Sequence, residues 1–263
     1  MAAENTYGDL VQQIGGVHVN VLSIVSDPNV DPHEYESNVE NARRIADADF
    51  VIANGGGYDE WIDKLMASSQ NTRRTVIHAF DIAPVHLKEN EHVWYNPDNV
   101  LVLSQKINEI LKQKDPHHAA EFDANFAALK ADLLKLNARL ASLKAKYGKT
   151  PILVTETIFL YQSELLGLKV LTPWTFDKAI AEGNDPSAAD AILAEKQVKE
   201  RQGKLLVFNV QTITPITTKL QDEAKALHIP VVAVSETMPP ALHYQSWMSG
   251  QLDALERALG AVP

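Results

Sequence analysis

Residues His118–Tyr147 read HAAEFDANFAALKADLLKLNARLASLKAKY. This segment contains neither Pro nor Gly, and its large apolar residues recur at spacings of three and four: Phe122, Phe126, Leu129, Leu133, Leu136, Leu140 and Leu143. The spacing predicts one uninterrupted helix of about 30 residues, which would be about 45 Å long. Because such a helix exceeds the size of one α/β lobe, we expect it to join two lobes. A coiled coil is the alternative, but the sequence has only one such segment.

Strand-like and helix-like patterns alternate on both sides of this segment, which favours α/β layering with mostly parallel strands. The strands expected before it are Val17–Ile24, Phe50–Ala53 and Thr75–Ile77, with helices at 7–14, 37–46, 59–66 and from Asn96-Pro97. The strands expected after it are Ile152–Thr155, Leu205–Val210 and Val231–Ser235, with helices at 158–166, from an Asp185-Pro186 cap to Arg201, from Thr214-Pro215, and at 244–259. No strand is expected before the first helix. We therefore predict an α/β fold with two lobes, at 1–115 and 149–263, each with a mostly parallel sheet flanked by helices and joined by one long rigid helix at 116–148.

The composition excludes several classes of function. The chain has 263 residues with 45% apolar and 22% charged residues, which is ordinary for a globular protein. Its 34 acidic and 24 basic residues give a net charge of −10, which disfavours nucleic acid as a partner and favours cations. With no Cys, thiolate metal sites and a cysteine nucleophile are excluded. The sequence from Met1 to Glu4 does not resemble a signal peptide, which fits either a cytosolic protein or an exported protein whose leader is absent from this chain. Of the two, we expect the exported protein.

Reactive side chains follow several of the expected strands. In open α/β sheets, ligands bind at the carboxyl ends of the strands, so these side chains are candidates for a site. His33 lies in a proline-framed loop after the first strand, and His92 lies in a long loop, 80–96. Glu156 and Glu236 each follow a strand directly. For each residue taken alone, a surface position or a helix cap is the ordinary interpretation.

Together, two imidazoles and two carboxylates form a chemically coherent set of metal ligands. Neutral His supplies nitrogen, and two Glu side chains supply two negative charges, which neutralise a divalent ion. Mixed nitrogen and oxygen ligands suit Mn²⁺, Zn²⁺ or Fe²⁺ better than Ca²⁺ or Mg²⁺. The ligands are not closely spaced in sequence, as they are in His-Glu-x-x-His, so spacing alone does not identify a metal site.

Other candidate features have simpler interpretations. Asn54–Gly57 could bind phosphate at a helix N-terminus, but it lacks the Gly-x-Gly-x-x-Gly spacing and a Walker lysine, so we expect a tight turn. We expect His117 and His118 to be solvated surface residues. Tyr58 and Trp61 are expected to pack within a lobe rather than to form an aromatic cage.

Several motifs, distributed along the whole chain, resemble one family. They are AAENTYGD at 2–9, DPHEY at 31–35, ADFVIANG at 48–55, HVWYNP at 92–97, Thr155-Glu156 with Phe159–Tyr161 and Gly167-Leu168, and Ser235–Thr237. Together these motifs resemble the metal-binding solute-binding proteins of bacterial ABC importers, in the cluster A-I group that carries zinc or manganese. The resemblance implies two α/β lobes joined by one long helix, with a single metal ion between them.

The same resemblance implies a set of ligands. It places the two histidine ligands at His33 and His92 and the third ligand at Glu156. The fourth is usually an Asp a few residues beyond a Glu that matches Glu236, but here Met238–Ala241 occupies those positions. We therefore expect Glu236 to replace the Asp, with a water molecule as the alternative. A Glu as third ligand and the absence of a His-rich loop favour Mn²⁺, although Zn²⁺ often binds the same ligands more tightly.

The function implied is capture of a divalent metal and delivery to the ABC permease, without catalysis. The resemblance further implies a monomeric lipoprotein on the extracellular face of the membrane, with an anchor and a first strand preceding the region that matches Ala2–Glu4. Two alternatives remain open. One is a metal-dependent hydrolase with the same ligands, for which Glu34 is the candidate general base. The other is a surface adhesin or interaction module.

Overall fold

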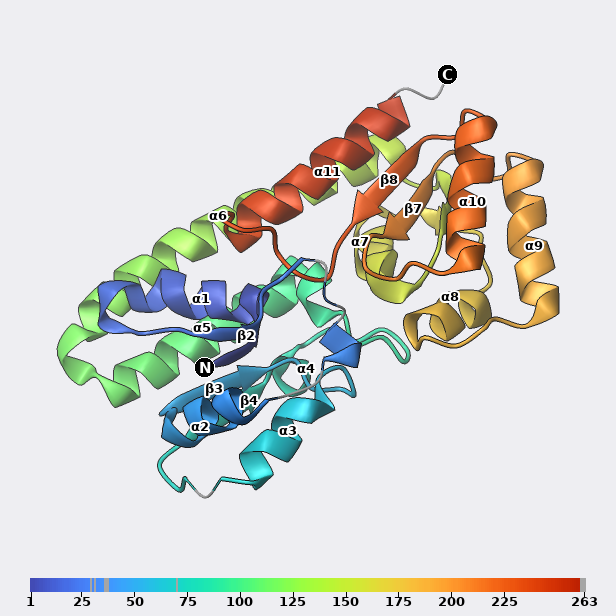
Figure 1. Cartoon of the computed structure of the whole chain (residues 1–263). Helices are drawn as coiled ribbons and strands as arrows, with labels where there is room; N and C mark the ends of the chain where they lie inside the picture. The colour runs from blue at the N-terminus through green and yellow to red at the C-terminus, as the bar shows by residue number, and fades with distance from the viewer. Residues whose placement is uncertain (29, 31, 36–37, 70, 261–263) are drawn as a thin grey trace. The chain divides into compact units, whose positions relative to one another are not determined.

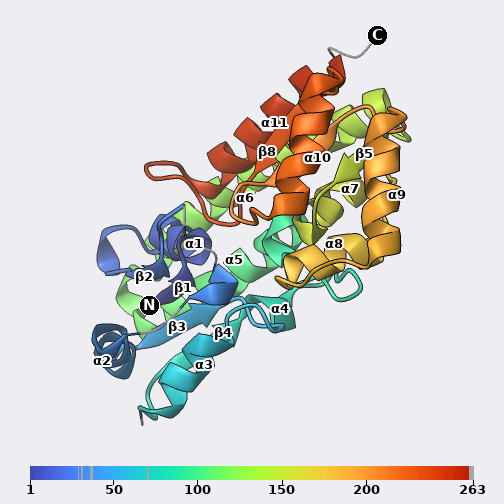
Figure 2. The same ribbon diagram turned by 45° about the vertical axis from the view of Figure 1, so that its right-hand side comes forward.

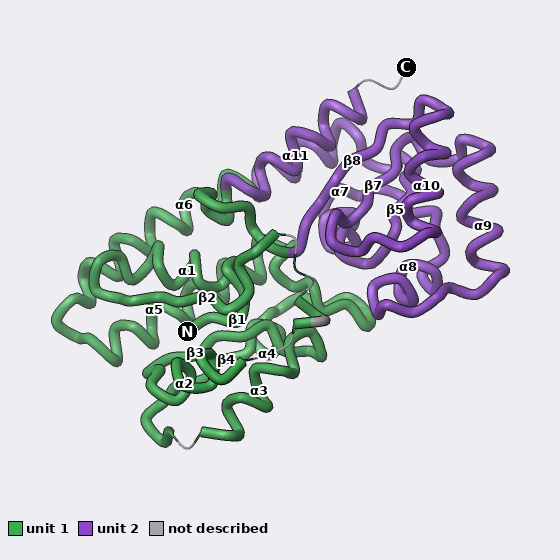
Figure 3. The backbone as a smooth tube through the Cα atoms, in the orientation of Figure 1, with its two compact units in different colours: residues 1–136, 237–245 green, residues 137–236, 246–263 purple. Residues whose placement is uncertain are grey.

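The computed structural model describes residues 1–263 except 29, 31, 36–37, 70 and 261–263. The chain forms two compact units, one made of residues 1–136 and 237–245 and the other of residues 137–236 and 246–263 (Figure 3). Each unit contains a four-stranded sheet in which every pair of neighbouring strands is parallel. The long helix α6, Ala119–Tyr147, belongs to both units and joins them. The predicted fold class is therefore confirmed.

The first unit, which includes the blue N-terminal part of the chain in Figure 1, has the strand order β2-β1-β3-β4, and all four strands are labelled in Figure 2. Its strands are β1 Ala2–Glu4, β2 Ser23–Val25, β3 Phe50–Ala53 and β4 Thr75–His78. Its helices are α1 Asn5–Gly15, α2 Val39–Asp47, α3 Glu60–Ala67, α4 Ala79–Ile82, α5 Pro97–Lys114 and the first part of α6, with short 3-10 helices η1 Gly16–His18, η2 Pro32–Glu34, η3 Val93–Tyr95 and η4 Pro116–His118. Apolar residues of α2 and α3 pack on β1, β2 and β3 to form a buried core, which removes their surface from water.

The start of the chain differs from the prediction. Ala2–Glu4 is an interior strand, in which Ala2 pairs with Ser23 on one side and with Ile52 on the other. Three residues of Ala-Ala-Glu carry no β-strand signature of their own, so the two neighbouring strands decide their conformation. The predicted strand Val17–Ile24 begins too early, because the 3-10 helix η1 covers Gly16–His18 and the strand β2 covers only Ser23–Val25.

The second unit has the strand order β6-β5-β7-β8. Its strands are β5 Pro151–Val154, β6 Lys169–Val170, β7 Leu206–Asn209 and β8 Val231–Val234. Its helices are the last part of α6, η5 Thr157–Phe159, α7 Leu160–Leu166, α8 Trp174–Ala181, α9 Ala188–Lys199, α10 Pro215–Ala226 and most of α11 Tyr244–Gly260. Residues of α8, α9 and α10 pack on β5 and β7 in one buried cluster. In this unit α11 lies along α6, where Arg139 bonds to Asp253 (Figure 2).

Local signals located several helix starts correctly. The Asn96 side chain caps α5 with Pro97 as its first residue, and Thr214 forms a capping box at the start of α10. By contrast, Ser187 rather than Asp185 caps α9, and β6 and α8 were not predicted. Of the seven apolar residues that predicted α6, all but Phe126 are buried, as expected for one continuous amphipathic helix.

Among the described residues, none of the helices combines the length and apolar character needed to cross a bilayer.

Candidate metal centre

His33 lies at the centre of η2, in the first unit. The indole N–H of Trp61 on α3 donates to the carbonyl of Pro32 at 3.2 Å, which ties this short helix to the core. The imidazole of His33 packs edge-on against the buried ring of Tyr58, with ring centroids 4.4 Å apart. The side chain is 23% exposed, so one side of it still reaches solvent. The histidine is therefore held by its neighbours on a rigid support.

His92 is completely buried, at the end of the long loop that precedes η3. Its backbone N–H and its Nδ1 atom both lie 3.0 Å from the side-chain Oδ1 of Asn90. An atom that accepts from a backbone N–H must be the oxygen of the amide, so Nδ1 of His92 carries the proton. The remaining nitrogen, Nε2, is then the one with a lone pair. This is the arrangement in which an outer hydrogen bond fixes the tautomer of a metal-binding histidine.

The two predicted histidines lie side by side within the first unit. Their ring centroids are 6.2 Å apart, and Tyr58 touches both rings. The carboxylate of Glu91 lies 3.6 Å from Nε2 of His33. Tyr58 thus packs in the lobe, as predicted, and also lines the histidine pair. The sequence gives no role to Asn90 or Glu91, although both directly precede His92 in the long loop at 80–96.

The glycine-rich segment after β3 is the tight turn that the sequence predicts. Gly55 and Gly56 have positive φ angles of 73° and 67°, and a Cβ on Gly56 would lie 2.6 Å from the ring of Phe80. The backbone N–H groups of Asn54 and Gly55 donate to the Asp59 carboxylate at 2.6 and 2.7 Å. These two backbone donors are therefore already used and do not point at a phosphate. Burial raises the pKa of Asp59 despite these hydrogen bonds.

This turn also supports the loop that carries His92. The Asn54 side chain donates to the backbone carbonyl of Glu91 at 3.0 Å, and its amide oxygen accepts from the hydroxyl of Tyr7. Helix α1, the turn after β3 and the long loop are thereby linked through one buried amide. The position of His92 consequently depends on contacts between segments that are distant in the sequence.

Glu156 directly follows Thr155, at the carboxyl end of β5 in the second unit, and its side chain is buried. One carboxylate oxygen, Oε2, accepts from the backbone N–H of Ile158 at 2.8 Å and caps η5. The capping role that is ordinary for a Glu after a strand is therefore present. It uses Oε2 and fixes the direction of the carboxylate.

Glu236 follows Ser235, which itself follows β8, and is also buried in the second unit. Its Oε1 accepts from the side-chain N–H of Asn209 at 2.6 Å, and its backbone N–H donates to Oε1 of Gln211 at 2.6 Å. Because β5, β7 and β8 are parallel neighbours, Glu156 and Glu236 follow strands that end at the same edge of the sheet. Sequence reasoning missed Asn209 and Gln211, whose only signal was their place at the end of a strand.

The four side chains fit the chemistry of a divalent transition metal. Two imidazoles come together in the first unit, and two buried carboxylates end at one sheet edge in the second. A carboxylate that is ionised and buried is costly unless a cation compensates for it. A divalent ion supplies that compensation, and nitrogen and oxygen together suit Mn²⁺ and Zn²⁺. The side chain of Glu34, the candidate base of the hydrolase alternative, lies outside the described part of the structure.

Comparisons with known proteins agree with this chemistry. The profile of the ZnuA family, described as zinc-uptake complex component A, periplasmic, matches residues 1–258. The chain is 25% identical over 279 residues to the metal ABC transporter substrate-binding lipoprotein SsaB of Streptococcus sanguinis, covering 98% of this chain and 88% of that protein. It is 26% identical over 283 residues to the manganese ABC transporter substrate-binding lipoprotein ScaA of Streptococcus gordonii, with the same coverage.

Solved structures show the same fold. The periplasmic zinc-binding protein TroA of Treponema pallidum superposes with a TM-score of 0.81 at 20% identity, covering 98% of this chain and 97% of that one. The substrate-binding protein FpvC of Pseudomonas aeruginosa, solved in complex with Mn²⁺, gives 0.79 at 22% identity, with the same coverage. The chain belongs to the ZnuA family, because the family profile spans residues 1–258 of its 263 residues.

Proposed function

We propose that this chain is an extracytoplasmic solute-binding protein that captures one divalent transition metal ion and passes it to the permease of an ABC importer. The ligands in this proposal are His33, His92, Glu156 and Glu236. The single observation that carries it is the Asn90–His92 pair, in which the amide oxygen holds the Nδ1 proton and orients Nε2 as a metal ligand. The metal is the cargo, so binding must be tight and reversible rather than catalytic.

The charges of the ligands support a divalent ion as cargo. Two carboxylates and two neutral imidazoles give a set with a charge of −2, which one M²⁺ neutralises. The excess of acidic residues, which gives the chain a net charge of −10, attracts cations and repels anionic solutes. Ligands that titrate also make affinity depend on pH, because protons compete with the metal for imidazole and carboxylate. The proposed metal is Mn²⁺ or Zn²⁺.

The choice between the two metals rests on Glu156. With a carboxylate as third ligand, the set contains two nitrogens and two or more oxygens, which suits Mn²⁺. The S. gordonii relative is named as a manganese protein, and FpvC was solved with Mn²⁺, whereas TroA is named as a zinc-binding protein. We propose Mn²⁺ as the cargo, with Zn²⁺ binding the same ligands more tightly in vitro, as the general order of metal affinities requires.

We also infer where the protein acts. Relatives such as SsaB are named as lipoproteins of ABC transporters, and we propose that the precursor of this chain is anchored by lipid at the outer face of the membrane. The proposed partner is the membrane permease, and the proposed state is a monomer. Gel filtration coupled to light scattering tests the monomer, and lipid labelling of the full-length precursor tests the anchor.

The central experiment is a competitive titration of Mn²⁺ against Zn²⁺ on metal-free protein. Each of the variants His33→Ala, His92→Ala, Glu156→Ala and Glu236→Ala is expected to lose well over tenfold in affinity, since even the partners that orient ligands are worth about 10–100-fold. His86→Ala and Glu164→Ala, which change exposed residues away from these ligands, are the matched controls. Circular dichroism verifies that each variant is folded. A residue whose truncation leaves affinity unchanged is not a ligand.

The same preparation tests the absence of catalysis. The metal-loaded protein is expected to release no product from ester or phosphoester substrates. Turnover that requires the bound metal and is lost in His33→Ala would replace the transport proposal with the hydrolase alternative.

A further inference from the structure

A second group of metal-binding side chains lies in the first unit, away from η2 and the loop that carries His92. His18 ends η1, His118 ends η4, and Glu121 lies in the first turn of α6. One ligand atom from each of the three residues lies within 4.8 Å of the other two. We call this group the His18 cluster. About a hundred residues separate His18 from its two partners, so only the tertiary structure brings them together.

The cluster has close internal contacts. Nε2 of His18 lies 2.9 Å from Oε2 of Glu121, and since a carboxylate accepts there, this nitrogen carries a proton that a bound metal ion would displace. The rings of His18 and His118 are stacked, with centroids 3.7 Å apart and planes inclined by 17°. Both rings pack near the buried ring of Phe122. His118 keeps 37% of its side chain accessible and lies at the surface as predicted, with one ring face covered by His18, and the neighbouring His117 is exposed.

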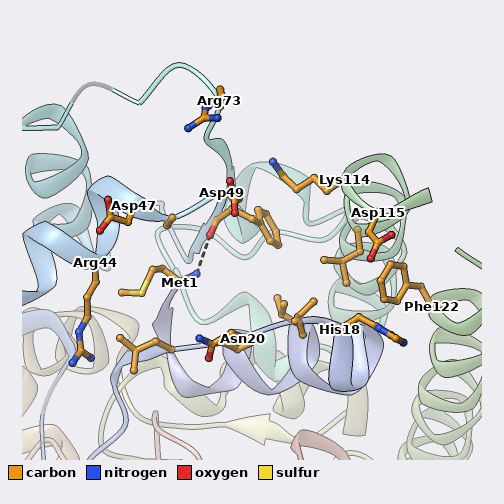
Figure 4. A pocket seen from close by; sticks show the side chains of 17 residues that line it. Met1, His18, Asn20, Arg44, Asp47, Asp49, Arg73, Lys114, Asp115 and Phe122 are labelled. Atoms are coloured by element: carbon orange, nitrogen blue, oxygen red, sulfur yellow. Dashed lines mark hydrogen bonds between the residues drawn. The ribbon is translucent and has the colours of Figure 1, made fainter. Parts of the chain in front are cut away.

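Asp115 orients one of the histidines. Its Oδ2 lies 2.6 Å from Nδ1 of His118, and a carboxylate can only accept there, so Nδ1 carries the proton. Nε2 of His118 is then the nitrogen with the lone pair. A carboxylate that accepts from the outer nitrogen of a histidine is the usual support for a histidine bound to zinc. In Figure 4, His18, Asp115 and Phe122 lie together at one end of a cavity that is also lined by Met1 and by residues 19–22.

The local sequence explains why these residues meet. Gly16, with a φ of 56°, ends α1 and turns the chain so that His18 follows in a 3-10 helix. The side-chain amide of Asn125 on α6 donates to the carbonyl of Ile14, which holds the end of α1 against α6. Pro116 begins η4, the short connection between α5 and α6 that carries His118. Both histidines are thus on short, supported turns rather than on free loops.

We propose that His18, His118 and Glu121 form a second binding site, for a divalent transition metal ion of the zinc class, with Asp115 positioning His118. Two imidazole nitrogens and one carboxylate oxygen are ligands that Zn²⁺ takes in proteins at about 2.0–2.2 Å. Tetrahedral ligands at that bond length lie about 3.3 Å apart. The ligand atoms here lie within 4.8 Å of one another, so binding requires the two partly exposed rings to rotate out of their stack until both lone pairs point at the ion. Water fills the remaining position.

The proposed site shares no residue with the transport ligands. Its ligands are more exposed, with 63% of the Glu121 side chain and 37% of the His118 side chain accessible, so binding loses more side-chain entropy there. We therefore expect weaker affinity than at the transport ligands. Because a bound ion would link the end of α1 to the junction of α5 and α6, it would also stabilise the first unit against unfolding.

The test is the stoichiometry of Zn²⁺ binding to metal-free full-length chain, measured by equilibrium dialysis with metal analysis. Wild type is expected to bind two equivalents, one tight and one weaker. His18→Ala, His118→Ala and the conservative Glu121→Gln are expected to lose only the weaker one. His33→Ala is expected to lose only the tight one, which separates failure of this proposal from failure of the transport proposal. His117→Ala, the neighbouring exposed histidine, is the matched control and should keep both.

A second measurement is the melting temperature of the protein already loaded with one equivalent. Further Zn²⁺ is expected to raise it in wild type and in His117→Ala, but not in His118→Ala or Glu121→Gln. A wild type that binds one equivalent at saturating free Zn²⁺ would overturn the proposal. The proposal would also be overturned if both His18→Ala and His118→Ala still bound the second equivalent of Zn²⁺. Loss of that equivalent in His117→Ala would overturn it as well.

Discussion

Asn209, the last residue of β7, donates its side-chain N–H to Oε1 of Glu236 at 2.6 Å. The two residues are brought together by the register of the sheet, in which Asn209 pairs with Val234 on β8. A neutral amide that donates to a carboxylate stabilises its charged form and fixes its orientation without neutralising it. The Asn209 amide therefore fixes the orientation of the Glu236 carboxylate. This supports its proposed role at the position where the expected Asp is replaced by the Met238–Ala241 segment.

If Asn209 positions Glu236, its removal should weaken metal binding without removing a ligand. We expect Asn209→Ala to lower the affinity for Mn²⁺ by about 10–100-fold, the usual effect of losing a partner that orients a ligand. A chelator competition assay measures the change. Asn184→Ala, at an exposed position of the same unit, should leave affinity unchanged. Equal affinities for the two variants would show that Glu236 is not a ligand or does not need this support.

The Asn90–His92 pair gives a prediction with a rescue. Asn90→Ala removes the acceptor that holds the Nδ1 proton of His92 and should cost about 10–100-fold in metal affinity. Asn90→Asp keeps an acceptor at that place and should recover most of the loss. Titration of wild type, Asn90→Ala and Asn90→Asp with Zn²⁺ and Mn²⁺ measures the loss of affinity and its recovery. If the Asp and Ala variants bind equally weakly, Asn90 acts only through the fold of the loop.

The glycine turn after β3 predicts a difference between two neighbouring substitutions. Gly56→Ala places a Cβ at 2.6 Å from the Phe80 ring on a backbone with φ of 67°, whereas at Gly57, with φ of 94°, a Cβ meets nothing within 4 Å. Both variants place an alanine in a left-handed conformation, which costs free energy, but only Gly56→Ala also adds a clash. We expect Gly56→Ala to lose about 1–3 kcal/mol of unfolding free energy, more than Gly57→Ala. Urea unfolding measures both, and equal losses would argue against a close contact with Phe80.

Asp177 on α8 predicts a dependence of stability on pH. Burial raises its pKa well above the usual value, and its one hydrogen bond in the described structure, 3.3 Å from the Thr172 hydroxyl, only partly offsets this. An acid whose pKa is raised in the folded state binds more protons folded than unfolded, so wild-type stability falls as pH rises from the unfolded toward the folded pKa. Asp177→Asn removes the titration. It should be more stable than wild type at pH 7.

The extra stability of Asp177→Asn over wild type should disappear in acid. Below about pH 3.9, the ordinary pKa of Asp, the carboxyl is neutral in both states and the two proteins should have similar unfolding free energies. Chemical denaturation across this range measures the curve. Asp222→Asn, at an exposed position of α10, should show no such trend. A variant less stable than wild type at pH 7 would mean that the ionised carboxylate is compensated in the folded protein.

Tyr244 predicts a loss of stability in the first unit. Its hydroxyl donates to the carbonyl of Trp94 at 2.7 Å and is fully buried, which raises its pKa and keeps the donor protonated. Tyr244→Phe leaves that buried carbonyl without its donor and should cost about 1–3 kcal/mol. Thermal or urea unfolding checks this value. Tyr147→Phe, where the ring is only half-buried, is the comparison and should cost less.

The sequence was informative where the signal is local. The long helix α6 follows from its apolar spacing, because a 3.6-residue period is a property of the segment itself. The starts of α5 and α10 follow from Asn96-Pro97 and Thr214-Pro215, because a cap acts within four residues. The order of strands and helices then placed Glu156 and Glu236 at strand ends. Their side chains are buried there, as candidate ligands should be.

The sequence was misleading where distant pairing decides. Ala2–Glu4 is a strand only because β2 and β3 lie on either side of it. The sequence pattern predicts a strand from Val17, whereas the structure leaves Val17 92% exposed in a 3-10 helix. Short strands such as β6, with two residues, carry too little pattern to be recognised. In each case the stabilising hydrogen bonds come from residues far along the chain.

By itself, then, the sequence determined the α/β class, the joining helix and the residue types available for binding a metal, since these depend on local periodicity and composition. Only the tertiary structure decided how those residues are held. It placed Asn90 on His92, Asn209 on Glu236, and His18 on His118. Such contacts join separate segments, and their geometry arises from strand register and packing, which no local pattern encodes.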